Sequence, residues 1–124
     1  VSVRFRQQLN ENAKMLCWHH VFPEMNHNEL VGWKAQNKEF AIVIFRNDTD
    51  DGRIQKRMEI CKEIFTKYTS TIIEVYSKGN SSLEKALYLI HLGDWVSWFL
   101  SELNKVDAME IDVINHLKSE LAKV

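Results

Sequence analysis

The sequence predicts an α/β domain with a parallel sheet, and three segments carry this prediction. Residues 40–45 (FAIVIF) form an uninterrupted apolar run that is typical of a buried strand. Residues 52–68 repeat apolar side chains at helical spacing, and residues 70–77 (STIIEVYS) indicate a second strand. A strand, a helix and a strand of these lengths form a βαβ unit, which pairs its strands in parallel.

The chain opens inside a helical pattern that is expected to run over residues 3–20. Pro23 ends this pattern because it has no N–H group and disfavours helical backbone at the residue before it. Residues 24–38 are then expected to form a loop with a short helical turn. Since no N-cap signal precedes the first helix, we expect the chain to be a piece of a longer protein.

Turn and capping signals predict the later elements. The polar loop 46–52 offers several N-cap residues for the following helix, and the first strand is expected to be buried on both faces. Ser81 or Ser82 is expected to cap a long helix over residues 82–104. This helix is apolar nearly all round, which suits a helix buried on several sides or one at a dimer interface.

The carboxyl-terminal helices also contain polar residues that call for an interpretation. His91 and Asp94 lie three residues apart and can touch on one helix face, where a satisfied buried pair is favoured over a supporting role at a site. Asp107 is the predicted start signal of a last helix over residues 109–122. On that helix Lys118 is, by default, a solvated charge.

Composition indicates one globular domain. The chain has 124 residues, 45% hydrophobic and 27% charged, with a net charge of −1 and no block of like charges. These values exclude a disordered chain and give no sign of a nucleic-acid or membrane partner. No apolar run reaches the length of a membrane span or a signal peptide. Cys17 and Cys61, without CxxC spacing, suggest buried free thiols in a reducing cytoplasm.

The stretch from Gln8 to Trp33 is the predicted functional segment. It holds three of the five histidines and the only proline, and residues 23–29 crowd carboxylates, amides and an imidazole together. A packed core avoids such groups, whereas a polar site requires them.

Glu11 is the first candidate within this segment. A glutamate on a helix is usually solvated, but the flanking Asn10 and Asn12 favour a site because amides orient carboxylates and sugar hydroxyls. A carboxylate that transfers protons near neutral pH needs its pKa raised above ~4.3 by desolvation.

His27 is the second candidate, and two other interpretations stand beside a catalytic one. Its ring could be tied to nearby backbone, to Glu24 or to Glu29, as in a structural histidine. A metal site that also used His19 and His20 is weakly supported, because the proline interrupts the helix and no pair has zinc-motif spacing.

Several motifs resemble the second sugar-isomerase (SIS) domain of the bifunctional phosphoglucose/phosphomannose isomerases of archaea and bacteria. They are NENAK at 10–14, PEMNHNE at 23–29, Gly32-Trp33, IHLGDWVSWFL at 90–100 and the turn at 104–108. The resemblance covers nearly the whole chain. It implies that residues 1–124 form a single, partial carboxyl-terminal SIS domain, with a parallel sheet in a three-layer αβα fold, from a two-domain enzyme of ~300 residues.

The resemblance also implies an activity that needs no metal or cofactor. The family interconverts glucose or mannose 6-phosphate with fructose 6-phosphate through a cis-enediol. Glu11 would move the proton between C1 and C2, His27 would assist ring opening from the partner subunit of a homodimer, and Lys118 would lie near the sugar ring oxygen. The implied supporting residues are Asn12, Glu24, Asn26 and Glu29.

One departure from the family limits what this chain does alone. The family's phosphate-binding serines and threonines, and the arginine that steadies the enediolate, belong to an N-terminal SIS domain that these 124 residues lack. The chain by itself is therefore expected to be inactive. The alternative functions are a non-catalytic SIS module that binds a phosphosugar or dimerises, and a metal-binding α/β domain.

Overall fold

The computed structural model describes residues 1–35 and 38–124, which form two compact units. One unit joins residues 1–18 to residues 90–124, and the other comprises residues 19–89. The elements are α1 (Ser2–Glu11), the 3₁₀ helix η1 (Glu24–His27), α2 (Glu29–Gly32), β1 (Ala41–Arg46), α3 (Gly52–Phe65), β2 (Thr71–Tyr76), α4 (Ser82–Asn104) and α5 (Asp112–Leu121). None of the described helices combines the length and apolarity that crossing a membrane requires.

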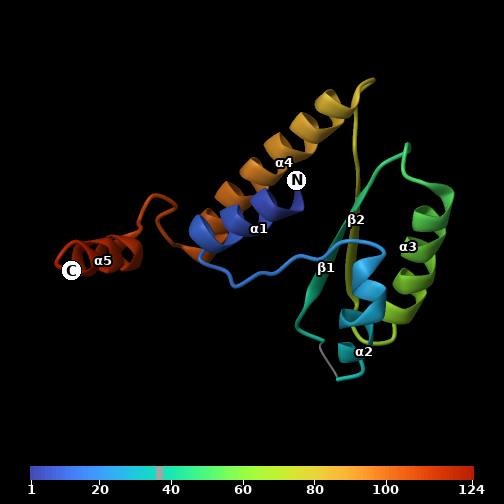
Figure 1. Cartoon of the computed structure of the whole chain (residues 1–124), viewed down its shortest axis with the longest axis horizontal. Coiled ribbons are helices and arrows are strands. Elements are labelled where there is room, and N and C mark those ends of the chain that lie inside the picture. The colour runs from blue at the N-terminus through green and yellow to red at the C-terminus, as the bar shows by residue number, and fades with distance from the viewer. Residues whose placement is uncertain (36–37) are drawn as a thin grey trace. The chain divides into compact units, whose positions relative to one another are not determined.

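The unit of residues 19–89 contains the sheet and confirms the predicted βαβ unit. Strands β1 and β2 pair in parallel, in a register that runs from Ala41 opposite Thr71 to Arg46 opposite Tyr76. Helix α3 connects the strands and lies beside them (Figure 1). The predicted loop and short helical turn over residues 24–38 correspond to η1 and α2; residues 36 and 37 of that prediction lie outside the described part.

A small apolar core holds this unit together. Its buried members are Met25, Trp33, Cys61 and Phe65, and the Trp33 and Phe65 rings lie 5.1 Å apart. Burial of large apolar side chains stabilises by about 1.5–3 kcal/mol each. Because these residues come from η1, from α3 and from the segment after α2, the core fixes the turn that carries His27 against α3.

The prediction that the first strand is buried on both faces is wrong for this chain. Val43 is 37% exposed, and Ile73, its partner in register, is exposed as well. Side chains alternate between the faces of a strand, and Ile42 packs against the core cluster on the covered face. The opposite face, which carries Val43, remains open in this chain.

Caps set the ends of the helices more sharply than periodicity does. The Asp51 side chain accepts from the N–H of Arg53 at 2.9 Å and begins α3. Ser81 and Glu84 form a reciprocal capping box: the Glu84 N–H donates to the Ser81 hydroxyl at 3.2 Å, and the Ser81 N–H donates to the Glu84 carboxylate at 2.9 Å. Helix α3 ends at Phe65, three residues before the predicted end, because the chain turns there toward β2.

In the other unit, α1 lies along the carboxyl-terminal half of α4 (Figure 1). Arg4 donates to both oxygens of Asp94, at 3.1 and 3.0 Å, and Gln8 donates to the same carboxylate at 3.0 Å. The hydrogen bond from Arg4 is the main cause that lowers the pKa of Asp94. The predicted buried pair with His91 is therefore wrong: Asp94 belongs to the α1 contact, and the exposed His91 accepts from the Trp95 indole at 3.1 Å.

The first helix is much shorter than predicted, ending at Glu11 rather than near residue 20. The Asn10 amide donates to the carbonyls of Arg6 and Cys17, at 2.8 and 3.1 Å, which folds the following residues back on the helix. Lys14 takes the left-handed conformation, with a φ of 56°, that ends a helix. Apolar spacing could not reveal this reversal.

Helix α4 has its predicted bounds but not its predicted burial. One face is exposed, so burial on several sides is wrong within this chain; a dimer interface stays a prediction. Its exposed apolar residues are Leu83, Leu87, Trp95, Trp98, Phe99 and Leu103. Helix α5 begins at Asp112, five residues after Asp107, because the Asp107 carboxylate accepts from Met109 in a turn instead of starting the helix.

Candidate active site

The predicted base, Glu11, is the last residue of α1 and its side chain is exposed. The two residues that fix this helix end are buried, Leu9 just before it and Ala13 just after it. Asn104 donates to the Ala13 carbonyl at 3.0 Å and so ties this turn to the end of α4. The buried Leu9 and Ala13 thus anchor the helix end that presents the exposed Glu11 carboxylate.

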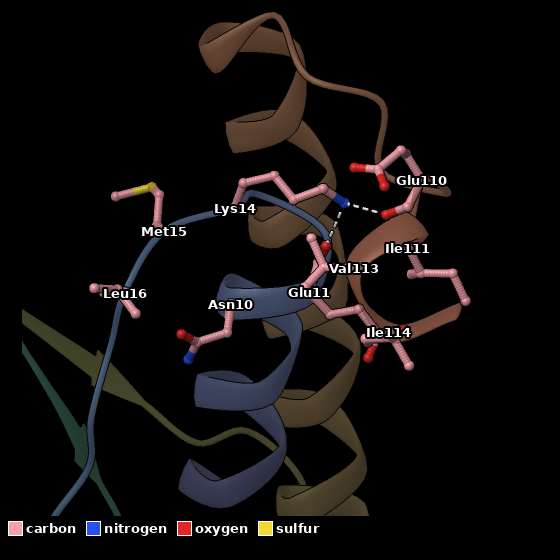
Figure 2. Close-up of a pocket in the computed structure, with 9 residues that line it drawn as sticks. All are labelled: Asn10, Glu11, Lys14, Met15, Leu16, Glu110, Ile111, Val113 and Ile114. Carbon is pink, nitrogen blue, oxygen red and sulfur yellow. Dashed lines mark hydrogen bonds between the residues drawn. The ribbon is translucent and has the colours of Figure 1, made fainter. Parts of the chain in front are cut away.

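Glu11 lines a cavity of about 300 Å³ in the same unit (Figure 2). The walls come from the end of α1, the residues after it and the start of α5, and the lining residues are Asn10, Glu11, Lys14, Met15, Leu16, Glu110, Ile111, Val113 and Ile114. Its volume is at the lower end of the range that small-molecule sites occupy. The cavity is open to solvent, and it places the Glu11 carboxylate beside the exposed apolar side chains of Leu16, Val113 and Ile114.

Lys14 spans one side of this cavity. Its ammonium donates to the main-chain carbonyl of Glu11 at 2.6 Å and to that of Glu110 at 2.7 Å (Figure 2). Lys14 lies in the NENAK motif at 10–14, and the sequence alone assigned no role to this lysine. The left-handed backbone of Lys14 and its hydrogen bond to Glu110, 96 positions away, produce no pattern that the neighbouring sequence displays.

Asn12, a predicted supporting residue, uses its side-chain amide to hydrogen-bond to α1 and to α4. Its amide donates to the Gln8 side chain at 3.1 Å and to the Ser97 hydroxyl at 3.0 Å. Ser97 is fully buried on α4 and itself donates to the Asp94 carbonyl at 2.8 Å. Asn12 thus supports Glu11 by fixing the end of α1, and it is not among the residues that line the cavity.

His27 lies in the other unit, at the end of η1, and its side chain is exposed. Within residues 1–35 and 38–124 its ring has no hydrogen bond to the protein. Glu24 instead accepts from Asn28 at 3.3 Å, and Glu29 accepts from the Trp33 indole at 3.3 Å. The interpretation of His27 as a structural residue, with its ring bonded to Glu24 or Glu29, is therefore wrong for this structure.

The supporting residue Asn26 fixes this turn to α3. Its amide donates to the Cys61 sulfur at 2.9 Å, and its oxygen accepts from Arg57 at 3.3 Å. Burial raises the pKa of the Cys61 thiol, and the hydrogen bond from Asn26 opposes this. Cys61 is a buried free thiol, as predicted, whereas Cys17 is only partly buried. Arg57 and Cys61 were not predicted as site residues.

Lys118 lies on α5, exposed, and is not part of the cavity wall. It shares a unit with Glu11, while His27, Glu24, Asn26 and Glu29 belong to the unit of residues 19–89. The proposed site residues thus divide into two groups, each held within its own unit. In the described part of the chain, His, Cys, Asp and Glu side chains form no group of three or more that could hold a metal ion.

Comparison with known proteins identifies the family to which this fold belongs. Residues 1–121 match the family described as the bacterial phospho-glucose isomerase C-terminal SIS domain. The chain belongs to this family, so its βαβ unit is part of a sugar-isomerase type of α/β domain.

Three relatives of known name are similar to this chain over nearly its whole length. The chain is 37% identical over 126 residues to the bifunctional phosphoglucose/phosphomannose isomerase of Aquifex aeolicus, covering 99% of this chain and 39% of that protein. The protein of the same name from Thermoplasma volcanium is 37% identical, over 98% of this chain and 39% of its own length. The protein of that name from Caldicellulosiruptor bescii is 35% identical, over 100% of this chain and 38% of its own length. The chain thus spans about two fifths of the curated relatives that it matches.

Proposed function

We propose that this chain is the carboxyl-terminal part of an isomerase that interconverts glucose 6-phosphate or mannose 6-phosphate with fructose 6-phosphate. The names of its relatives and its family membership support the proposal. The observation that carries it is the exposed Glu11 carboxylate at the wall of a ligand-sized cavity. In this proposal residues 1–124 are one partial SIS domain, which an amino-terminal SIS domain completes with the phosphate-binding groups.

The chemistry follows from the residue types. In the open-chain aldose, Glu11 takes the proton from C2, the electron pair of that C–H bond forms the C1–C2 double bond, and the π pair of the C1 carbonyl moves onto O1, which gains a proton to give the cis-enediol. The O2 hydroxyl then loses its proton and becomes the C2 carbonyl, while Glu11 returns its proton to C1 to give the ketose. The net change is a proton moved from C2 to C1 and one moved from O2 to O1, so the step needs no oxidant or metal. A carboxylate in position for this transfer contributes about 10²–10⁴-fold to the rate.

His27 and Lys118 take the other proton-handling roles. The ring of His27 is exposed and without a protein hydrogen bond in the described residues, so it is available to a sugar hydroxyl. We assign it to ring opening in the active site of the other subunit of a homodimer, and Lys118 to the ring oxygen. Glu24, Asn26 and Glu29 hold the turn that presents His27.

The principal test is Glu11→Gln in the polypeptide that joins this chain to the amino-terminal domain. The amide keeps the shape of the side chain but accepts no proton at this strength, so turnover of fructose 6-phosphate should fall by at least ~10²-fold. Glu102→Gln, at an exposed position near the end of α4, is the matched control and should keep full activity. Retention of most activity by Glu11→Gln would exclude Glu11 as the base.

Mixed dimers test the assignment of His27 to the partner. Glu11→Gln and His27→Ala homodimers should each be nearly inactive. After subunit exchange, the mixed dimer has one site with both residues intact, so a random mixture should recover up to about a quarter of the parent activity. If the mixture stays inactive while each variant is folded, the two residues act within one subunit.

Four further measurements separate the alternative functions. The 124-residue chain alone should show no turnover, and a chelator should leave the joined polypeptide fully active. A joined polypeptide that binds hexose 6-phosphate without turning it over would indicate the non-catalytic binding module. Stoichiometric zinc in the purified protein would indicate the metal-binding domain.

A further inference from the structure

The Lys14 ammonium joins two segments that both face the Glu11 cavity. It donates to the main-chain carbonyl of Glu11, which ends α1, and to that of Glu110, two residues before α5 (Figure 2). No side-chain atom of Glu11 takes part in these two bonds. The Glu11 carboxylate is therefore left free while its main chain is held.

We propose that Lys14 is a positioning residue for the isomerisation: it fixes the main chain of Glu11 relative to the opposite cavity wall at the start of α5. This inference rests on the proposed function, because it assigns to Lys14 the placement of the base. The same contact fixes the start of the helix that carries Lys118.

A lysine suits this place for an electrostatic reason. The last four carbonyls of a helix lack intrahelical donors and carry the negative end of the helix dipole, and the Glu11 carbonyl is one of them. An ammonium has three donors and a full charge, so it can satisfy two carbonyls at once with charge-assisted hydrogen bonds. A neutral side chain at this position would hold the two segments more weakly.

The backbone of Lys14 shows that the side chain does more than end the helix. Its φ of 56° lies in the left-handed region, where glycine is the usual residue. Lys105, after α4, has the same φ of 56°, and its neighbour Val106 donates to the Ser101 carbonyl at 3.0 Å in a typical helix-ending turn. Within the described residues the Lys105 side chain has no hydrogen-bond partner. Glycine would serve the turn at both places, so the ammonium bridge is what distinguishes Lys14.

This pair of lysines supplies a matched experiment in the polypeptide that joins this chain to the amino-terminal domain. Lys14→Gly keeps the turn and removes the bridge, whereas Lys105→Gly makes the same backbone change where there is no bridge. We expect Lys14→Gly to lower kcat by ~10- to 100-fold, since a displacement of about 1 Å costs this much, with KM changed less than ~3-fold. Lys105→Gly should keep kcat, and Lys14→Arg, which still donates to two carbonyls, should recover most of it.

A structural readout accompanies the kinetics. Amide hydrogen exchange in the same joined polypeptide should accelerate at residues 11–15 and 110–114 in Lys14→Gly and in Lys14→Gln, but not in Lys14→Arg. Lys14→Gln keeps a side chain and loses the charge, so it carries the test if the glycine variant does not fold.

The outcomes separate this inference from the proposed function. If Lys14→Gly or Lys14→Gln keeps kcat within twofold while Glu11→Gln is inactive, Lys14 is not a positioning residue and the isomerase assignment stands. A rise in KM at constant kcat, or unchanged exchange in both segments, overturns the positioning role as well. If Glu11→Gln is itself fully active, the proposed function has failed, whatever Lys14 does.

Discussion

Gly93 of α4 faces the Phe5 ring of α1, and Gly93→Ala measures how tightly α1 packs against α4. A Cβ atom built on Gly93 would lie 2.9 Å from Cδ2 of Phe5, which is inside normal contact distance. Alanine in a helix interior gains about 1 kcal/mol over glycine from helix propensity. Overpacking of a fitted contact costs about 1–3 kcal/mol, so the cost should exceed the gain.

We therefore expect Gly93→Ala to lower the free energy of unfolding by about 1 kcal/mol, which for a chain of this size is a fall of roughly 3–5 °C in Tm. Urea unfolding followed by circular dichroism measures the change. Gly52→Ala is the control, because nothing lies within 4 Å of its new Cβ at the start of α3. It should stabilise the chain by about 0.4–1 kcal/mol.

A double mutant identifies the cause. In a Phe5→Ala background the obstructing ring is gone, and Gly93→Ala should become stabilising by about 1 kcal/mol, the propensity gain alone. If Gly93→Ala stabilises the chain even with Phe5 present, the ring moves aside freely and α1 is not seated by this contact. The support of Glu11 would then depend on the hydrogen bonds at the end of α1, such as those of Asn12, Lys14 and Asn104.

Three other predictions concern contacts that each stabilise one of the two units internally. Ser81→Ala removes one half of the capping box of α4 and should cost about 1 kcal/mol in urea unfolding, whereas Ser82→Ala, beside it, should cost less. Because the pKa of Asp94 is lowered in the folded chain, its ionised form stabilises the fold above the ordinary carboxyl pKa, and this contribution is lost as the pH falls through the lowered value. Asp94→Asn should therefore reduce Tm at pH 7 and flatten the decline of Tm below pH ~4; a parallel decline in both proteins would contradict this. Arg46→Met removes an ion-pair partner from Glu59 and from the largely buried Glu74, which keeps Lys62 as its partner among the described residues, and should cost about 1–3 kcal/mol; no measurable loss would mean that water replaces Arg46 there.

The candidate site shows how far local sequence reasoning reaches. Residue types and motif order selected Glu11 and His27, and both side chains are exposed, so the described residues do not supply the desolvation expected of Glu11. The same reasoning missed Lys14, whose partner Glu110 lies 96 positions away, and Arg57, which meets Asn26 across 31 positions. A hydrogen bond between distant residues leaves no period or spacing that a sequence displays.

The errors in the fold have a related cause. Ala13 and Cys17 continue the helical spacing of the pattern predicted over residues 3–20, yet the Asn10 amide and the left-handed Lys14 end the helix at Glu11. Apolar character predicted full burial of the first strand, but burial depends on what packs against each face, and here only one face is covered.

By itself, the sequence determined the α/β class, the parallel βαβ unit and the bounds of the long helix over residues 82–104, because periodicity and caps act within a few residues of one another. Only the tertiary structure decided where α1 ends, which face of the sheet is covered, and that Asp94 pairs with Arg4, 90 positions away. Those features depend on contacts between distant segments. The cavity beside Glu11 exists because such contacts bring the start of α5 to the end of α1.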